Sequence, residues 1–187
     1  MKLITALGNP GKKYQTTRHN TGFLLIDLLR EKFLFQTNLT VTEWEEEKTF
    51  MSELSFLKKG SQIIAVFQKP MTYMNNSGIA VAKIVKKYGI ENLQENFLLL
   101  HDDLDLKLGN YKIQQGKAPQ GHNGVKDVEG CLKTTQFKRV RVGIESRSDK
   151  NIPGEDFVLM KFTQDERMIL NEVMEDIVKV LLPEILL

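Results

Sequence analysis

Polar residues and glycines gather at four places where an apolar segment gives way to a helix pattern. They include one histidine and several aspartates and asparagines, the side chains that perform general-base chemistry and hold a polar substrate. The four segments are residues 8–20, 70–78, 101–105 and 121–124. Because ligands of open α/β sheets bind beyond the carboxyl ends of the strands, we expect these segments to meet at one sheet edge.

His19 is the candidate base in this set. It directly precedes a predicted helix, whose positive end would keep the imidazole uncharged and able to accept a proton. A carboxylate such as Asp102 could fix the tautomer of the ring and stabilise it once protonated. Such a base typically contributes about 10²- to 10⁴-fold, which suits an already reactive ester. A buried, hydrogen-bonded histidine without catalytic function is the alternative that the spacing leaves open.

Other common catalytic motifs do not match the sequence. Residues 8–12 are too short for a P-loop, no GxGxxG is present, and Ser77 does not lie in a GxSxG. Three histidines without HExxH or paired cysteines do not form a zinc pattern. Asp102, Asp103 and Asp105 could hold Mg²⁺, but neighbouring strand residues point to opposite faces, so at most two would share a site.

The composition is that of a globular protein. The chain has 187 residues, of which 41% are hydrophobic and 27% charged, so one domain spanning residues 1–187 is expected. A lone cysteine, Cys131, and the lack of a long apolar run predict a cytoplasmic protein without disulfides. Residues 107–150 carry a local excess of basic side chains, whereas the whole chain has a net charge of +2. This segment indicates either a surface for a polyanion or an ordinary solvated face.

Strand and helix patterns alternate along the chain, which predicts an α/β fold: a single three-layer α/β/α domain with a mixed, mostly parallel central sheet. Asn20 is expected to cap the first helix, and Asn76 or Ser77 the second. The predicted strands are 2–7, 50–57, 63–68, 97–100, 111–113 and 139–144, and the predicted helices are 21–33, 77–88, 123–132 and 163–182.

Taken in order, these segments resemble the bacterial peptidyl-tRNA hydrolase family. No single motif carries the resemblance, which runs from Lys2 to about Phe162. The matching segments are LGNPG at 7–11, Tyr14, TRHNTG at 17–22, KPMTYMNNSG at 69–78, HDDLDL at 101–106, GHNG at 121–124 and FKRVRVGI at 137–144.

The resemblance implies hydrolysis of the ester that joins a peptide to the 3′ ribose of tRNA. In the family, the histidine here numbered His19 is the general base, and Asp102 matches the aspartate that holds it in its basic form. Asn9 matches the asparagine that helps to distinguish blocked from free aminoacyl esters. His101 and His122 are interpreted as structural. The substrate-binding positions implied are Tyr14, Tyr73, Met74, Asn75 and Asn123, with Met74 as an apolar wall of the cleft.

Basic residues of the 107–150 segment are the candidates for contacts with tRNA phosphates. Arg139 and Arg141 should share one strand face and form the best pair. The full set is Lys112, Lys117, Lys126, Arg139, Arg141 and Lys150. The chain departs from the family at Gln114, where a lysine is frequent, at Glu145, where a glycine is common, and at Pro119, which stiffens a loop.

The expected protein is thus a monomeric esterase acting on peptidyl-tRNA, with no metal, no cofactor and no membrane contact. Two alternatives remain at this stage. One is a catalytically idle RNA-binding member of the same fold. The other is a phosphoryl-transfer enzyme that uses the turn at Gly8 and the aspartates, and it would need Mg²⁺ and a nucleotide.

Overall fold

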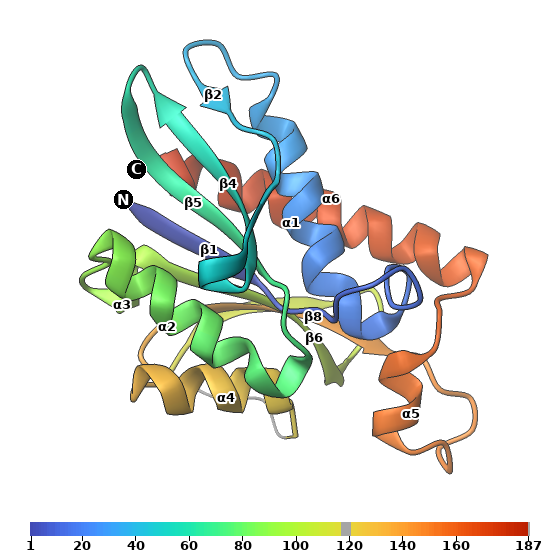
Figure 1. The fold of residues 1–187 in the computed structure, drawn as a ribbon. Coiled ribbons are helices and arrows are strands. Elements are labelled where there is room, and N and C mark those ends of the chain that lie inside the picture. The colour runs from blue at the N-terminus through green and yellow to red at the C-terminus, as the bar shows by residue number, and fades with distance from the viewer. Residues whose placement is uncertain (117–120, 187) are drawn as a thin grey trace.

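One mixed sheet forms the centre of the computed structural model, which describes residues 1–116 and 121–186 (Figure 1). The strand order is β2-β4-β5-β1-β6-β8-β7, and β3 pairs with β4 outside this path. The strands are β1 (Lys2–Ala6), β2 (Thr40–Val41), β3 (Glu45–Glu47), β4 (Ser52–Lys59), β5 (Gln62–Pro70), β6 (Phe97–Lys107), β7 (Tyr111–Gln115) and β8 (Lys138–Glu145). Parallel pairing joins β5, β1, β6 and β8, and antiparallel pairs flank them on both sides. The predicted mixed sheet is confirmed.

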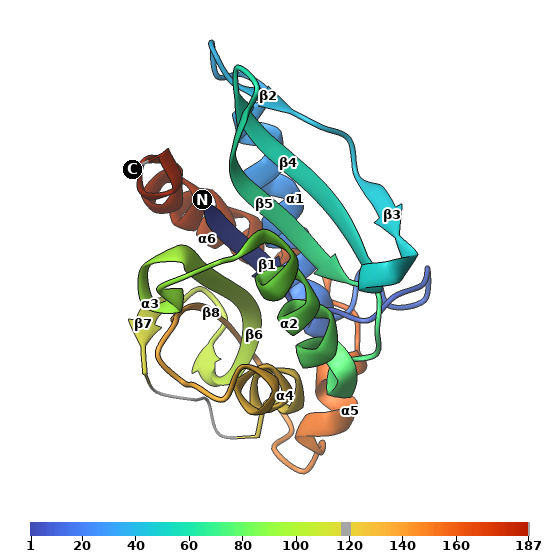
Figure 2. The ribbon, with the colours of Figure 1, turned by 60° about the vertical axis from the view of Figure 1, so that its left-hand side comes forward.

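Helices cover both faces of this sheet and complete the predicted three layers (Figure 1; Figure 2). On one face lie α1 (Thr21–Phe33) and α6 (Gln164–Leu186), and on the other α2 (Ser77–Tyr88) and α4 (Asn123–Leu132). Two shorter helices are α3 (Leu93–Asn96) and α5 (Gly154–Leu159), and the 3₁₀ turns are η1 (Arg18–Asn20), η2 (Lys48–Phe50) and η3 (Met74–Asn76). Within the described residues, no helix is long and apolar enough to cross a membrane.

The central strands are apolar on both sides because both of their faces are covered. In β1, Ile4 and Ala6 pack toward α1 and α6, whereas Leu3 packs toward α2 and α4. The end of β1 and the apolar part of β6 therefore lie between two hydrophobic cores, so the polar residues after β1 and those within β6 start from a rigid base.

Three helix predictions need correction. The expected cap of α2 is absent, because the Asn76 side chain makes no cap bond and Ser77 is already the first residue of the helix. The final helix continues to Leu186 and includes Pro183, because its apolar stripe does not stop at Leu182: Leu181 and Ile185 are both buried. Asn20 precedes α1, but its side chain does not cap the helix. It bonds to the backbone of Asn9 instead. Helices α1 and α4 have their predicted bounds.

Gly22, in the first turn of α1, fixes how closely that helix approaches the sheet. A Cβ at this position would lie 2.5 Å from the carbonyl oxygen of Leu7 and 2.6 Å from that of Leu100. Both contacts are with backbone atoms, which side-chain rotation cannot relieve. The close approach sets the position of η1, since that turn leads directly into α1.

We predict that Gly22→Ala destabilises the protein by about 3 kcal/mol, at the upper end of the range for overpacking. Gly130→Ala in α4 is the matched control, because a Cβ there meets nothing within 4 Å. This control should be neutral or stabilising by roughly 0.5–1 kcal/mol, as alanine is the better helix former. Urea unfolding of both variants measures the difference, and equal stabilities would contradict the packing argument.

Candidate active site

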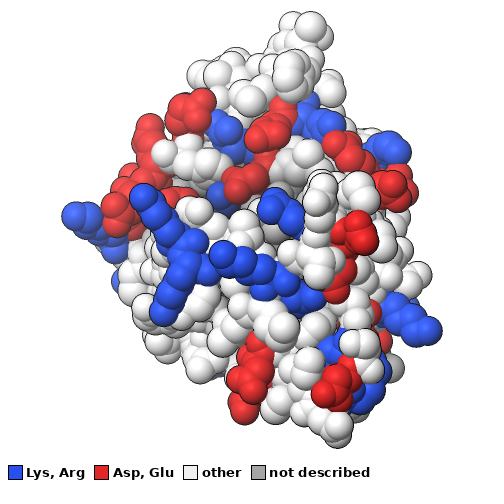
Figure 3. Space-filling view, turned by 90° about the vertical axis from the view of Figure 1, so that its right-hand side faces the viewer, with Lys and Arg blue, Asp and Glu red and all other residues white. Residues whose placement is uncertain are grey.

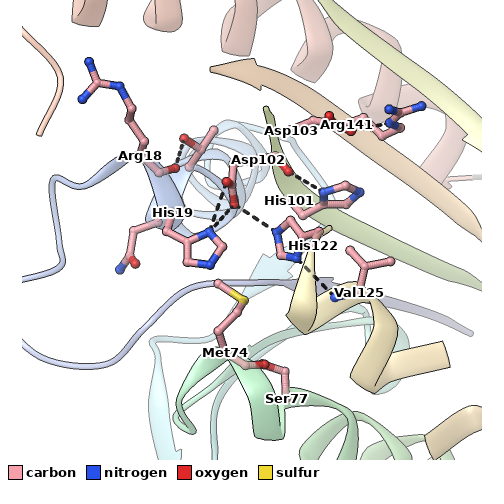
Figure 4. A network of polar contacts seen from close by, with 12 residues as sticks. Arg18, His19, Met74, Ser77, His101, Asp102, Asp103, His122, Val125 and Arg141 are labelled. Atoms are coloured by element: carbon pink, nitrogen blue, oxygen red, sulfur yellow. Dashed lines mark hydrogen bonds and ion pairs between the residues drawn. The ribbon is translucent and has the colours of Figure 1, made fainter. Parts of the chain in front are cut away.

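The four polar segments lie together at the carboxyl ends of the parallel strands. His19 lies in η1, Asp102 and Asp103 lie on β6, and His122 directly precedes α4 (Figure 4). The 70–78 segment joins them through Met74, whose N–H donates to Asn9 Oδ1 at 3.0 Å. The convergence that the topology predicted is therefore present in the structure.

A hydrogen bond joins His19 to Asp102. The Nδ1 atom of His19 lies 2.9 Å from Asp102 Oδ1 and 3.1 Å from Oδ2. A carboxylate only accepts hydrogen bonds, so Nδ1 carries the proton and Nε2 has a free lone pair. The His19 side chain is 14% exposed, whereas that of Asp102 is 2% exposed. The ring thus stands between a buried carboxylate and the solvent.

His122 is a second donor to the same carboxylate, a contact that its interpretation as a structural residue did not include. Its Nε2 lies 3.1 Å from Asp102 Oδ1, and its Nδ1 accepts the N–H of Val125 at 3.3 Å. The bond from Val125 leaves the proton on Nε2, so the neutral ring donates to Asp102 while capping α4. The sequence signals for this position are its location directly before a predicted helix and within the polar GHNG segment at 121–124.

His101 supports Asp102 from the other side. Its Nδ1 lies 2.6 Å from the main-chain oxygen of Asp102, and its ring meets the His122 ring edge-on with centroids 4.9 Å apart. Burial first, and then the electrostatic interaction with the neighbouring His122, lower the pKa of His101 to about 3. This ring is therefore neutral at ordinary pH and holds the backbone of Asp102, which agrees with a structural interpretation.

The electrostatics of His19 differ from the sequence-based expectation. Burial lowers the pKa of His19, but the charge of Asp102 and its hydrogen bond outweigh burial, so the net pKa lies above the ordinary 6.5. The helix end that was expected to keep the ring neutral is outweighed by the adjacent carboxylate. Burial raises the pKa of Asp102, yet its interactions with His19 and His122 hold that pKa well below its usual range.

Asn9 is held in one orientation. Its backbone N–H donates to Asn20 Oδ1 at 2.9 Å, and Asn20 Nδ2 donates to the Asn9 carbonyl oxygen at 2.9 Å. Its own Oδ1 accepts the N–H of Met74. Among the described residues, Nδ2 of Asn9 has no acceptor, so this N–H₂ group is available to a ligand.

A cavity of about 390 Å³ opens beside His19 and Asp102. Asn123 and His122 line its polar part, whereas Leu104, Val158 and Leu159 form an apolar wall. The cavity therefore combines a base, an amide and apolar surface, as a binding site for an organic ester requires.

Met74 does not supply that apolar wall. Its side chain is 5% exposed and belongs to the core between the sheet and α2 and α4. The sulfur lies so close to Gly124 that a Cβ there would be 2.4 Å away. Leu104 and the α5 residues Val158 and Leu159 form that wall instead. Sequence reasoning missed Val158 and Leu159 because α5 is distant in the chain from the four polar segments.

The remaining predicted substrate residues lie near the site but not in the wall of this cavity. Asn75 is exposed in η3, and Tyr73 beside it is 61% exposed. Tyr14 is partly buried and lies under the Lys13 ammonium, 4.6 Å from its ring centroid. Their roles in binding remain predictions.

The predicted pair of phosphate-binding arginines is wrong. Arg139 is fully buried and forms an ion pair with Glu129 of α4. Arg141 is 8% exposed, pairs with Asp103 and donates to Gln114 Oε1 at 3.0 Å. Both side chains share the α4-facing side of β8, as expected, but there they hold protein carboxylates and cannot reach a phosphate.

Of the lysines predicted to bind tRNA phosphates, one is paired with a carboxylate and two are exposed. Lys150 is exposed but pairs with Glu145 at 2.9 Å. Hydrogen bonds, first from Arg147 and then from Lys150, lower the pKa of Glu145 to about 2. Lys112 and Lys126 are exposed, and Lys117 lies outside the described residues. Lys112 and Lys126 therefore remain candidates.

A metal could be held by His19, Asp102 and His122, whose ligand atoms lie within 4.8 Å of one another. The separations of 2.9 and 3.1 Å between nitrogen and oxygen match hydrogen bonds. Ligands about 2.1 Å from a tetrahedral zinc ion would instead stand roughly 3.4 Å apart. The geometry thus favours protons between these atoms. Asp103, a candidate for Mg²⁺, is paired with Arg141.

We predict that His19 titrates above pH 6.5 and that Asp102→Asn lowers its pKa, because burial then acts without the opposing carboxylate. NMR titration of the imidazole Cε1–H signals measures both values. His101 is the internal control, since its signal should not move at neutral pH. An unchanged His19 pKa in Asp102→Asn would contradict the electrostatic coupling.

Known proteins that resemble this chain in sequence and structure are peptidyl-tRNA hydrolases. A family model described as Peptidyl-tRNA hydrolase matches residues 3–186. A protein of that name from Phytoplasma mali is 38% identical over 172 residues, covering 92% of this chain and 91% of the relative. One from Kosmotoga olearia is also 38% identical, over 94% of this chain and 86% of the relative. The crystal structure of peptidyl-tRNA hydrolase from Acinetobacter baumannii superposes with a TM-score of 0.82 at 30% identity, over 96% of this chain and 85% of that one. The chain belongs to the peptidyl-tRNA hydrolase family.

Proposed function

We propose that this chain hydrolyses the ester between a peptide, or an N-blocked aminoacyl group, and the 3′ ribose of tRNA. The observation that carries the proposal is the hydrogen bond of His19 to the buried Asp102 at the mouth of an open cavity. Family membership identifies the substrate class. An idle RNA-binding protein would have no need to keep a base, its carboxylate and the cavity together.

In the reaction, Nε2 of His19 takes a proton from water, and the resulting hydroxide attacks the ester carbonyl carbon. The carbonyl π electrons move to oxygen, which amide N–H donors such as Asn123 and Asn9 Nδ2 stabilise. Collapse of the tetrahedral intermediate breaks the bond to the ribose oxygen, which receives the proton from the imidazolium. The products are a peptide with a free carboxyl group and a tRNA with a free 3′ ribose.

Asp102 acts on the charge of the ring and not on the substrate. When His19 accepts a proton, the new positive charge lies 2.9 Å from a carboxylate in a low-dielectric environment. The raised pKa of His19 expresses the same attraction. Protonation of His19 is therefore favoured during the attack. The ring must be neutral before it can accept this proton, however, so its raised pKa limits activity at acidic pH.

The amides of the site suit a substrate of any peptide sequence. Each asparagine offers a donor and an acceptor, which matches the peptide main chain and ignores its side chains. A free α-ammonium group would lose its hydration in a site whose partners are neutral amides, and the free-energy cost of this desolvation is high. We propose that Asn9, held by Asn20 and Met74, contributes to this discrimination. Further parts of the proposal are that the enzyme is a cytoplasmic monomer and needs no cofactor.

We predict that His19→Ala lowers kcat by at least about 10³-fold, within the range for loss of a general base. Asp102→Asn should lower it less, because the base itself remains. The assay follows hydrolysis of N-acetyl-aminoacyl-tRNA and free aminoacyl-tRNA side by side, with EDTA present. Wild-type protein should cleave the blocked ester preferentially.

Three outcomes would count against the proposal. Near-normal turnover by a folded His19→Ala variant would remove the mechanism. Loss of wild-type turnover in EDTA would indicate a metal-dependent site. A wild-type protein that binds tRNA but cleaves nothing would support the idle RNA-binding alternative.

Asn75 and Asn76 offer a matched pair, because both are exposed neighbours in η3 and the Asn76 side chain makes no cap bond to α2. We predict that Asn75→Ala raises KM or lowers kcat by about tenfold, equivalent to one lost hydrogen bond of roughly 1.4 kcal/mol. Asn76→Ala should change neither. Steady-state kinetics of both variants test the role of Asn75, and equal effects would refute it.

A further inference from the structure

Part of the basic segment 107–150 is paired with carboxylates of the protein itself. Arg139, Arg141 and Lys150 all hold carboxylates. A nucleic acid whose ester binds at His19 must therefore contact some basic side chains outside the 107–150 segment. Phosphates near the reacting bond need cations near His19, because exposed charges are screened within about 10 Å at moderate salt.

Lys12 and Lys13 lie in the short segment that separates Asn9 from His19. Both are exposed, and among the described residues neither has a carboxylate within ion-pair distance. Lys161 is a third exposed lysine on this side, since its backbone pairs with Thr17 in a β-bridge. Figure 3 shows Lys and Arg side chains across the middle of this face, which is the right-hand side of Figure 1.

The segment that carries the two lysines is a tight turn. Gly11 has φ +102°, a value that glycine adopts readily, and the N–H of Tyr14 bonds to the Gly11 carbonyl oxygen at 3.0 Å. The Tyr14 carbonyl oxygen in turn accepts both the N–H and the hydroxyl of Thr17, at 2.9 and 2.8 Å. With Asn9 held at one end and His19 bonded to Asp102 at the other, the backbone of Lys12 and Lys13 has a fixed position within the segment that leads to the base.

Aromatic surface accompanies these charges. The Lys13 ammonium lies 4.6 Å from the centroid of the Tyr14 ring. Interaction with Tyr14 raises the pKa of Lys13 above its ordinary value. Tyr73 is 61% exposed. Cations interleaved with accessible aromatic rings are the composition that binds single-stranded nucleic acid.

We propose that Lys12 and Lys13 bind phosphates of the single-stranded 3′ end of the tRNA, next to the nucleotide that carries the ester. The inference rests on the proposed function and adds a substrate contact to it. Contacts of this type read no sequence, as an enzyme that accepts many tRNAs requires. The alternative is that both lysines are merely solvated.

The test compares Lys12→Ala/Lys13→Ala with Lys86→Ala/Lys87→Ala. The control pair is also adjacent and exposed, and lies at the far end of α2. Three substrates are used with each variant: N-acetyl-aminoacyl-tRNA, the same ester on a CCA trinucleotide, and the same ester on adenosine, which has no phosphate.

The 12/13 variant should raise KM for the tRNA and trinucleotide esters by about tenfold, equivalent to two exposed charge contacts. The dependence of log(kcat/KM) on log salt should become shallower by roughly 1.4, from about 0.7 for each single-strand phosphate. The adenosine ester should show no such KM difference from the wild type, and the 86/87 variant should match the wild type throughout.

Two results would overturn the inference. One is an unchanged KM and salt slope for the trinucleotide ester in the 12/13 variant. The other is an equal loss on the adenosine ester, which would indicate a disturbed His19 and not a lost phosphate contact. If wild-type protein cleaves none of the three esters, the proposed function itself fails, and this outcome is distinct from the other two.

Discussion

A buried carboxylate with no cationic side chain fixed against it is the feature on which this site depends. Asp102 is 1% exposed, and among the described residues its side-chain partners are the imidazoles of His19 and His122. Burying such a charge costs several kcal/mol even in real proteins, and two neutral N–H donors offset only part of that cost. The environment is therefore better satisfied when one ring becomes cationic. Of the two rings, only His19 reaches the cavity with a free Nε2. Asp102 therefore stabilises the positive charge that forms when His19 accepts a proton from water.

The fold produces this arrangement because the end of β1 lies beside the part of β6 that leads into Asp102. Chain leaving β1 turns through Asn9 and returns to η1, while β6 runs two residues past its apolar run to place Asp102. The His122 ring accepts the N–H of Val125 at the start of α4 and donates to the Asp102 carboxylate, so a single side chain joins this helix to the site. Gly22 lets α1 approach close enough for η1 to hold His19 over the strand end.

Sequence reasoning could predict what is local or periodic. The bounds of α1 and α4 follow from their apolar spacing, and His19 and Asp102 stand out because reactive residues follow buried strands. It could not predict which charges neutralise one another. Arg139 and Arg141 look identical to free cations in the sequence, because Glu129 and Asp103 become their partners only through tertiary packing. The position of Asn20 before a helix predicts a cap for the same reason: its actual partner, Asn9, lies on the other side of a turn and comes near only in the folded chain.

Arginines and lysines have different roles in this protein: buried arginines stabilise the fold, and exposed lysines are the ones available to the substrate. Guanidinium groups form rigid, multiple hydrogen bonds. Those of Arg139 and Arg141 are buried and tie β8 to α4 and to β6. Ammonium groups are strongly hydrated and give weaker, salt-sensitive contacts at the surface. An enzyme that must release a free tRNA after each turnover gains nothing from gripping its polyanion with buried charges, since tight binding of substrate and product alike does not speed the chemical step. Contacts from exposed lysines would hold the substrate only modestly. The stronger interaction is that between Asp102 and His19, and it develops when His19 takes a proton during the reaction, where it accelerates hydrolysis.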